Sequence, residues 1–275
     1  MRGEFLDLDG ARVYYYAAGW RGGGDPIVLL HGFPTSSHLW QGVVPLLPDG
    51  HRVVVVDLLG FGRSDRPAGR DVSIRGHAER VRQVLDALGI ERACVAGHDI
   101  GGAIAQTMAL RWPQRVSALV LVNAAAYDAW PQREVKMARA MLPLTRHLPA
   151  TFLLSVLRTD LLRGYVATDR GAHAIERYVK PFASPEGRDA FFEHLLALDP
   201  RDTAALAPRL GDVVAPTAVV WGAHDPFLPA SIGERLARDL PGATLDVITD
   251  GRHFTPEEHA ERVSAAIAKV APRDG

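Results

Sequence analysis

The octapeptide Val95-Ala96-Gly97-His98-Asp99-Ile100-Gly101-Gly102 combines the end of a strand, a sharp turn and the start of a helix. A short apolar run leads into it, and residues 103–110 that follow have a helical character. Glycines two positions before and two positions after Asp99 keep Cβ atoms away from a backbone bent too sharply for ordinary residues. The pattern Gly-x-nucleophile-x-Gly predicts a reactive aspartate at the apex, beside the free N–H groups of a helix N-terminus.

Length and charge set the first limits on the function. The chain has 275 residues, a formal net charge of −1 and 23% charged residues. This length accommodates one large α/β domain or a domain that carries an insertion. The balanced charge provides no field that would attract nucleic acid or an anionic membrane, so we expect neither as a partner. The eleven histidines are scattered singly, without the close pairing typical of metal ligands.

Cysteine content and the chain start indicate the compartment. Cys94 is the only cysteine, so the chain cannot form an internal disulfide, and we expect this thiol to be buried in a strand. The first ten residues lack the apolar core of a signal peptide, and no apolar run reaches the length of a membrane span. We therefore expect a cytoplasmic protein.

Apolar runs that predict buried strands alternate with segments of helical periodicity along most of the chain. The predicted strands cover residues 4–9, 12–17, 26–30, 52–59, 91–96, 116–122, 216–221 and 244–248. The predicted helices cover residues 74–88, 103–110, 231–240 and 257–270, together with a helix that begins after Thr35 or Ser36 and ends at Leu47. This alternation predicts a mostly parallel sheet covered by helices on both faces.

Residues 127–211 differ from the rest because they contain no β-rich run, only helical pieces broken by prolines. We predict a core domain made of residues 1–125 and 212–275, with residues 126–211 forming a helical cap over the carboxyl edge of the sheet. The alternative is that these helices simply extend the core. The cap is favoured because the insertion follows the first strand after the octapeptide.

Two further motifs place polar side chains just after predicted strands. Trp221-Gly222-Ala223-His224-Asp225-Pro226-Phe227 supplies a carboxylate, and Asp250-Gly251-Arg252-His253-Phe254 supplies a histidine. Because the carboxyl ends of parallel strands share one edge of the sheet, Asp99, Asp225 and His253 can converge there. Their order, nucleophile then acid then histidine, predicts a catalytic triad.

From Glu4 to Val270 the chain resembles the α/β-hydrolase fold family. The motifs that carry the resemblance are HGFP, DLLGFGRSDRP, GHDIGG, WGAHDPF and GRHF. An aspartate in the GHDIGG motif is similar to the branch that contains epoxide hydrolases and haloalkane or haloacetate dehalogenases. The resemblance implies an α/β-hydrolase fold with an inserted helical cap.

An aspartate nucleophile restricts the chemistry. A carboxylate is ionised at neutral pH without a base, and it can displace a leaving group from saturated carbon to form an alkyl ester on Asp99. His253, oriented by Asp225, can then activate the water that hydrolyses this ester. The backbone N–H groups of Phe33 and Ile100 are the predicted oxyanion donors. Attack on an ester or amide would instead give a mixed anhydride, which argues against esterase or protease activity.

The leaving group is less well defined by the sequence. Haloalkane dehalogenases usually carry a tryptophan after the nucleophile and often an asparagine in the HGxP motif, where this chain has Ile100 and Phe33. Fluoroacetate dehalogenases place arginines after the aspartate, where this chain has Ile100 and Ala103. Epoxide hydrolases share HGFP and protonate the departing alkoxide with cap tyrosines, although many also carry the tryptophan that Ile100 replaces. The candidate substrate-binding residues are Tyr127, Trp130, Tyr165, Tyr178 and Phe227.

The sequence thus predicts a hydrolase that uses neither a cofactor nor a metal and acts on a small apolar organic substrate and water. Epoxide opening is the first hypothesis and haloalkane dehalogenation the second. A third is that the fold serves binding or a non-hydrolytic step, which the intact acid and histidine argue against. The oligomeric state stays open.

Overall fold

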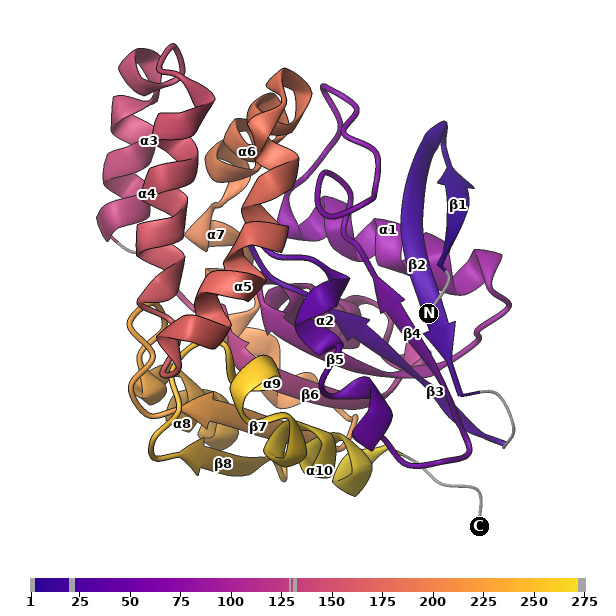
Figure 1. Cartoon of the computed structure of the whole chain (residues 1–275). Helices are drawn as coiled ribbons and strands as arrows, with labels where there is room; N and C mark the ends of the chain where they lie inside the picture. Colours follow the sequence, from indigo (N-terminus) through magenta and orange to yellow (C-terminus); the bar gives the residue numbers. More distant parts are fainter. Residues whose placement is uncertain (1–2, 20–22, 129, 131–132, 272–275) are drawn as a thin grey trace.

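The computed structural model describes residues 3–19, 23–128, 130 and 133–271. Its centre is a twisted eight-stranded sheet with the strand order β1-β2-β4-β3-β5-β6-β7-β8 (Figure 1). The strands are β1 (Glu4–Leu8), β2 (Ala11–Ala18), β3 (Gly24–Leu30), β4 (His51–Val56), β5 (Ala93–Asp99), β6 (Val116–Ala124), β7 (Thr217–Gly222) and β8 (Thr244–Ile248). The predicted α/β-hydrolase fold is confirmed by this architecture.

The sheet is antiparallel at one edge and parallel elsewhere. β1 and β2 form a hairpin around Asp9 and Gly10, both of which have positive φ angles. β2 also pairs antiparallel with β4, and all the remaining neighbours are parallel. β3, β5 and β6 form the centre, and from Ile27 to Leu30 and from Ala93 to His98 their side chains are buried. This burial on both faces explains why the central strands read as continuous apolar runs.

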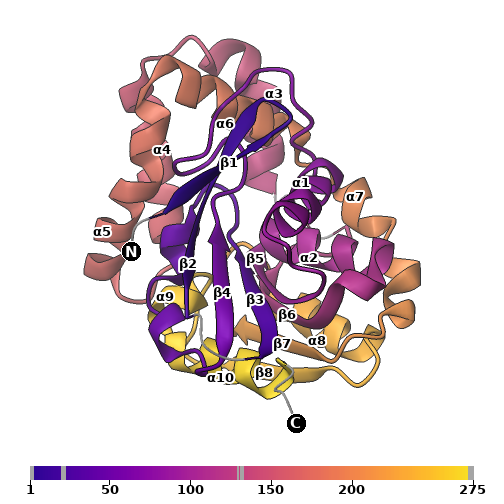
Figure 2. The same cartoon turned by 90° about the vertical axis from the view of Figure 1, so that its right-hand side faces the viewer.

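Helices cover both faces of the sheet, as Figure 2 shows. α1 (Ile74–Ala87), α2 (Ile100–Arg111) and α8 (Ala230–Asp239) lie on one face, and α10 (Ala260–Val270) packs on the other. α2 follows β5 directly and is buried along nearly its whole length. The helix that leaves the predicted nucleophile is therefore fixed on the central strands.

The segment between β6 and β7 is helical, as predicted. It contains α3 (Arg133–Thr145), α4 (Ala150–Leu162), α5 (Thr168–Val179), η4 (Lys180–Ala183), α6 (Pro185–Ala197), α7 (Pro200–Ala204) and η5 (Ala207–Asp212). α3 to α6 lie together beyond one end of the sheet in Figure 1. Ser184 caps α6 by accepting a hydrogen bond from the Gly187 N–H, as Ser-Pro at a helix start indicates. The division into core and cap domains stays a prediction.

Two predicted helices differ in the structure. The helix expected to end at Leu47 is replaced by two short 3₁₀ turns, η1 (Ser37–Trp40) and η2 (Val44–Leu46). Pro45 lacks the N–H that a continuous helix would need there. The closing helix is broken at His259 into α9 (Thr255–Glu258) and α10. The φ of −133° at His259 is outside the helical range.

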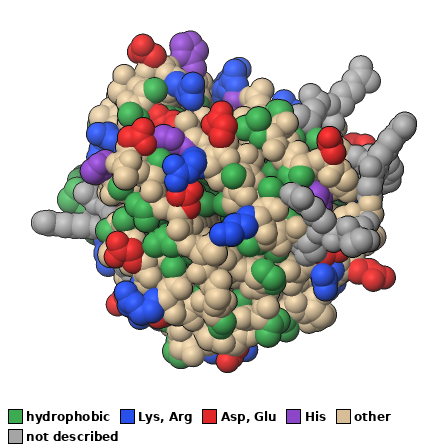
Figure 3. Space-filling model, turned by 90° about the horizontal axis from the view of Figure 1, so that it is seen from below, with side chains coloured by type: hydrophobic (Ala, Val, Ile, Leu, Met, Phe, Trp, Pro, Cys, Tyr) green, Lys and Arg blue, Asp and Glu red, His purple; other side chains and the backbone are tan. Residues whose placement is uncertain are grey.

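The burial expected for Cys94 is found in the structure. Cys94 is buried in β5, and burial raises the pKa of its thiol to about 12. Among the described residues, no helix is long and apolar enough to cross a bilayer. On the face seen in Figure 3, acidic and basic side chains are interspersed over the lower part of the molecule.

Candidate active site

Asp99 stands at the junction of β5 and α2, as the octapeptide predicts. Its backbone has φ 52° and ψ −121°, a strained conformation that ordinary residues avoid. The flanking glycines make the turn possible. A Cβ atom on Gly97 would lie 2.1 Å from the Gly101 carbonyl oxygen, and one on Gly101 would lie 2.4 Å from the Leu30 carbonyl oxygen. Only glycine fits at both positions.

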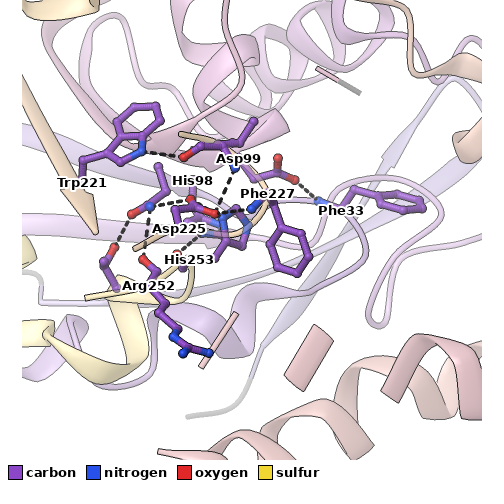
Figure 4. A network of polar contacts seen from close by, with 11 residues as sticks. Phe33, His98, Asp99, Trp221, Asp225, Phe227, Arg252 and His253 are labelled. Carbon is purple, nitrogen blue, oxygen red and sulfur yellow. Dashed lines mark hydrogen bonds and ion pairs between the residues drawn. The ribbon is translucent and has the colours of Figure 1, made fainter. Parts of the chain in front are cut away.

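The Asp99 carboxylate is held by two backbone N–H groups. The Phe33 N–H donates to Oδ2 at 2.8 Å, as Figure 4 shows, and the Ile100 N–H also donates to the carboxylate. Phe33 follows β3, whose carboxyl end lies beside that of β5 in the parallel sheet. The structure thus brings together the predicted nucleophile and both predicted oxyanion donors. Burial raises the pKa of Asp99 to about 6, against the charge of His253 and these two hydrogen bonds, which lower it.

Asp225 and His253 meet beside this aspartate (Figure 4). The His253 Nδ1 lies 2.8 Å from the Asp225 Oδ2, and both side chains are almost completely buried. The Asp225 Oδ1 accepts hydrogen bonds from the N–H groups of Phe227 and Leu228, at 2.8 and 3.0 Å. The carboxylate of Asp225 is therefore locked in a single orientation.

The His253 ring is positioned from its backbone as well. Its N–H donates to the Gly164 carbonyl oxygen at 3.0 Å, which connects it to the end of α4. Burial opposes a charge on the ring, but the charge and hydrogen bond of Asp225 and the charge of Asp99 together raise the pKa of His253 above its ordinary value. An oriented imidazole next to a carboxylate is the arrangement a general base requires.

Two positioning residues were not predicted. Asn123, at the end of β6, donates its amide to the Asp225 Oδ2 at 2.7 Å and accepts from the Thr255 hydroxyl at 2.8 Å. His98 lies beneath the His253 ring, and its Nε2 is 3.0 Å from the His253 carbonyl oxygen. Burial keeps the pKa of His98 far below its ordinary value, so the ring is neutral and donates through Nε2. A polar residue ending the apolar run of β6 was the signal for Asn123.

A cavity of about 110 Å³ opens above the triad, between the sheet edge and α4. Its lining is mainly apolar and consists of Phe33, Pro34, Asp99, Ile100, Trp130, Leu157, Asp160, Leu161, Arg163, Leu198, Phe227, Leu228 and His253. Trp130 and Phe227 therefore lie where the sequence placed them. Arg163 and Asp160 were not predicted. They form an ion pair at 2.7 Å, and the Arg163 guanidinium lies over the Phe227 ring at 5.6 Å.

The three candidate tyrosines lie elsewhere, and none lines this cavity. The Tyr127 hydroxyl donates to the Asp239 Oδ2 at 2.9 Å on α8. The Tyr178 hydroxyl donates to Glu257, and the Tyr165 ring stacks on Phe254 with centroids 4.2 Å apart. The sequence did not show which neighbouring residues each of these aromatic rings would pack against.

Comparison with known proteins supports the fold and the general chemistry. Residues 25–260 match the model of the alpha/beta hydrolase fold family. The chain is 29% identical over 274 residues to a 2-hydroxy-6-oxononadienedioate/2-hydroxy-6-oxononatrienedioate hydrolase of Paraburkholderia xenovorans, covering 93% of this chain and 89% of that protein. It is also 29% identical over 286 residues to haloalkane dehalogenase 2 of Mycobacterium tuberculosis, covering 96% and 93%.

The overall architecture is also found in solved structures. An alpha/beta hydrolase fold protein from Burkholderia ambifaria superposes with a TM-score of 0.88 at 27% identity, covering 97% of both chains. The enol-lactonase from Burkholderia xenovorans superposes with a TM-score of 0.82 at 25% identity, covering 97% of this chain and 99% of that one. The family match spans most of the chain and includes the elbow, the acid and the histidine. The chain therefore belongs to the alpha/beta hydrolase fold family and is a hydrolytic enzyme of that fold.

Proposed function

We propose that the enzyme hydrolyses a small apolar organic substrate at saturated carbon, through an alkyl ester on Asp99. The observation that carries the proposal is the carboxylate at the apex of the elbow, held by the Phe33 and Ile100 N–H groups beside His253. The Asp99 Oδ2 accepts the Phe33 N–H, and in the proposed step the carboxylate attacks carbon through its Oδ1. The bond to the leaving group breaks with its electron pair as the new C–O bond forms.

The second step hydrolyses the ester. His253 takes a proton from water, the resulting hydroxide attacks the Asp99 carbonyl carbon, and the N–H groups of Phe33 and Ile100 stabilise the oxyanion. The adduct then collapses: the bond between the carbonyl carbon and the alkyl oxygen breaks, and that oxygen takes the proton from His253 and leaves as the alcohol. Asp99 returns to a carboxylate when the added hydroxyl loses its proton to solvent. Alkylation removes the charge of Asp99, one of the contributions that raise the pKa of His253. The pKa of His253 then falls. A larger fraction of the histidine is therefore neutral after the first step and can act as the base in the second.

Among leaving groups, the cavity favours halide over epoxide oxygen. Epoxide opening needs an acid for the alkoxide, and the hydroxyls of Tyr127 and Tyr178 are bonded to carboxylates outside the cavity lining. The Trp130 N–H donates to Thr203 at 2.6 Å, so it is not available to a halide in this conformation. Arg163 is the cation of the lining, apart from His253, that can stabilise a departing halide. The similarity to a haloalkane dehalogenase supports the same choice.

The other relative suggests a different substrate, a dienedioate with two carboxylates. Arg163 pairs with Asp160 and is the one arginine among the described residues of the lining, so it can meet a single departing halide but not two substrate carboxylates. Attack of the Asp99 carboxylate on a ketone would give an acylated hemiketal, and attack on an ester would give a mixed anhydride. Neither intermediate would be easier to hydrolyse than the substrate carbonyl itself. We therefore place haloalkanes first and small epoxides second.

The test traps the ester. In His253→Gln the alkylation step remains and hydrolysis loses its base, a loss on the order of 10²–10⁴-fold. Incubation with a panel of small bromoalkanes and terminal epoxides should add the mass of one alkyl or hydroxyalkyl group to the peptide containing Asp99. Asp99→Asn with His253→Gln is the control and should gain nothing.

Isotope transfer gives an independent check. A single turnover of the native enzyme in ¹⁸O-water should label the Asp99 carboxylate, with unlabelled oxygen in the product. Label that appears first in the product would refute the covalent route. Halide release against diol formation on the same panel decides between the two leaving groups.

A further inference from the structure

A second cavity, of about 600 Å³, lies between the loop after Phe33-Pro34 and the helices α5 and η4. Its lining includes Ser36, Ser37 and His38 from the core and Arg177 and Lys180 from the helical segment. None of these residues lines the cavity above Asp99. The function proposed above makes no use of this cavity.

Three cations converge here from three elements. Arg63 comes from the loop after β4, Arg177 from α5 and Lys180 from η4. In the described part of the chain, none of the three forms an ion pair with a carboxylate, although other surface arginines do, for example Arg158 with Glu176. Unpaired cations that share one concave space repel one another, and an anion would remove that repulsion.

Asp57 is the carboxylate of this lining, and both of its oxygens already accept hydrogen bonds from the backbone. It is 1% exposed, and its two oxygens accept from the N–H groups of Ser37 at 2.6 Å and Arg63 at 2.8 Å. The carboxylate thus fixes the loop backbone beneath the cavity. With His38 neutral, the lining keeps two net positive charges, which matches a dianion.

Arg177 and Arg63 both act on the His38 ring. The Arg177 guanidinium contacts the His38 ring, and burial, together with the charges of Arg177 and Arg63, lowers the pKa of His38. The Arg63 guanidinium is held over the Tyr14 ring at 4.9 Å and donates to its hydroxyl at 2.6 Å. Arg63 therefore points in a fixed direction, as a binding group must.

Neutral donors complete the lining. The Ser36 oxygen accepts from the His38 N–H at 3.4 Å, which leaves its hydroxyl hydrogen for a ligand. Tyr16 also lines the cavity, and burial raises the pKa of its hydroxyl, so it remains a donor. Arginine forks, a lysine and hydroxyls that approach from different sides match the several oxygens of a phosphate group.

We propose that this cavity binds a phosphate-class dianion, either free phosphate or the phosphate group of a small metabolite. The site is separate from the catalytic cavity, so its test does not depend on the reaction. The probe is inorganic phosphate at about pH 8, titrated into the full-length protein in low-chloride buffer by isothermal calorimetry. We expect saturable binding of one phosphate per chain.

Two double variants of equal charge change test the assignment. Arg177→Gln with Lys180→Gln removes exposed cations of the cavity, and it should weaken binding about tenfold, the loss expected for two exposed charge-assisted contacts. Lys136→Gln with Lys269→Gln removes two exposed cations from α3 and α10 and should leave binding unchanged. Unfolding temperatures of both variants establish that they fold.

Each remaining outcome overturns the proposal. Absence of saturable heat would exclude a phosphate site. Equal weakening in both double variants would show a general charge effect, and equal binding of succinate would exclude selectivity for phosphate. If phosphate is bound, phosphorylated sugars and nucleotides in the same assay distinguish the free ion from a larger ligand.

Discussion

Replacement of the nucleophile by its amide, Asp99→Asn, should make the protein more stable while it removes activity. Burial raises the pKa of Asp99 from 3.8 to about 6, so the folded protein holds this carboxylate ionised at a cost in free energy at neutral pH. A shift of about two pKa units corresponds to about 3 kcal/mol. Asparagine keeps the shape and can still accept the Phe33 and Ile100 N–H bonds, but carries no charge to bury.

The sign of the effect depends on pH. Between about pH 4 and pH 6 the folded protein binds more protons at Asp99 than the unfolded chain does, so this group lowers the native stability as the pH rises. The advantage of Asp99→Asn should therefore be near zero at about pH 4 and should reach about 3 kcal/mol at pH 7. Urea unfolding at both pH values measures it, with the intact mass taken afterwards to exclude deamidation back to aspartate.

Asp225→Asn is the matched control, because it removes a second buried carboxylate of the same site. The Asp225 Oδ2 accepts from Asn123 and from His253 Nδ1, and an amide nitrogen in its place could accept from neither. This variant should lose about 1–3 kcal/mol instead of gaining stability. If Asp99→Asn were no more stable than the native protein at pH 7, the carboxylate would not be held ionised at a cost, and the reasoning would fail.

Three further predictions follow from the same geometry. The alkylation rate, measured by stopped-flow at a single turnover, should fall as the pH drops through about 6, because protonated Asp99 is not nucleophilic. Asn123→Ala should destabilise by about 1–3 kcal/mol in urea and slow ester hydrolysis more than alkylation, since Asp225 and Thr255 each lose a partner; equal slowing of both steps would contradict a positioning role. Gly101→Ala should lower the free energy of unfolding by about 3 kcal/mol or more, measured by urea unfolding, because its Cβ would meet the Leu30 carbonyl oxygen. Gly211→Ala, with open space around the added Cβ, is the control.

Much of the fold could be predicted because the central strands are buried on both faces, and this gives continuous apolar runs that sequence shows directly. The convergence of Asp99, Asp225 and His253 at one place could be predicted for a related reason. Asp99, Asp225 and His253 each follow such a run, and parallel strands bring their carboxyl ends to one edge. Knowing that each residue directly follows a buried parallel strand was therefore enough to place its backbone at the carboxyl edge of the sheet. The short 3₁₀ turns around Pro45 were missed because the helical pattern was stronger than the proline signal.

The cavity lining could not be predicted in the same way. Tyr127 and Tyr165 lie in connecting segments and Tyr178 lies on α5, and the packing of each segment against its neighbours decides which side chains face Asp99. Amphipathic periodicity shows that one side of α5 is buried, but not whether that side meets the cavity or a neighbouring element. Asp160 on α4 and Arg163 at its C-cap line the cavity for the same reason, and no sequence motif indicated them.

For the proposed mechanism, the geometry around Asp99 gives a reason why a buried carboxylate is a suitable nucleophile. The folded protein holds the ionised Asp99 side chain at a cost in free energy. Burial disfavours the charge more than the Phe33 and Ile100 N–H groups and His253 favour it. Forming a neutral ester releases that penalty, so the ground state of the first step is raised relative to the ester. The same N–H groups meet a full oxyanion again in the second step, when His253 delivers hydroxide. One pair of donors thus serves both half-reactions without moving. A serine at the apex has no carbonyl oxygen, so its side chain could not accept from these donors in the same way before the reaction.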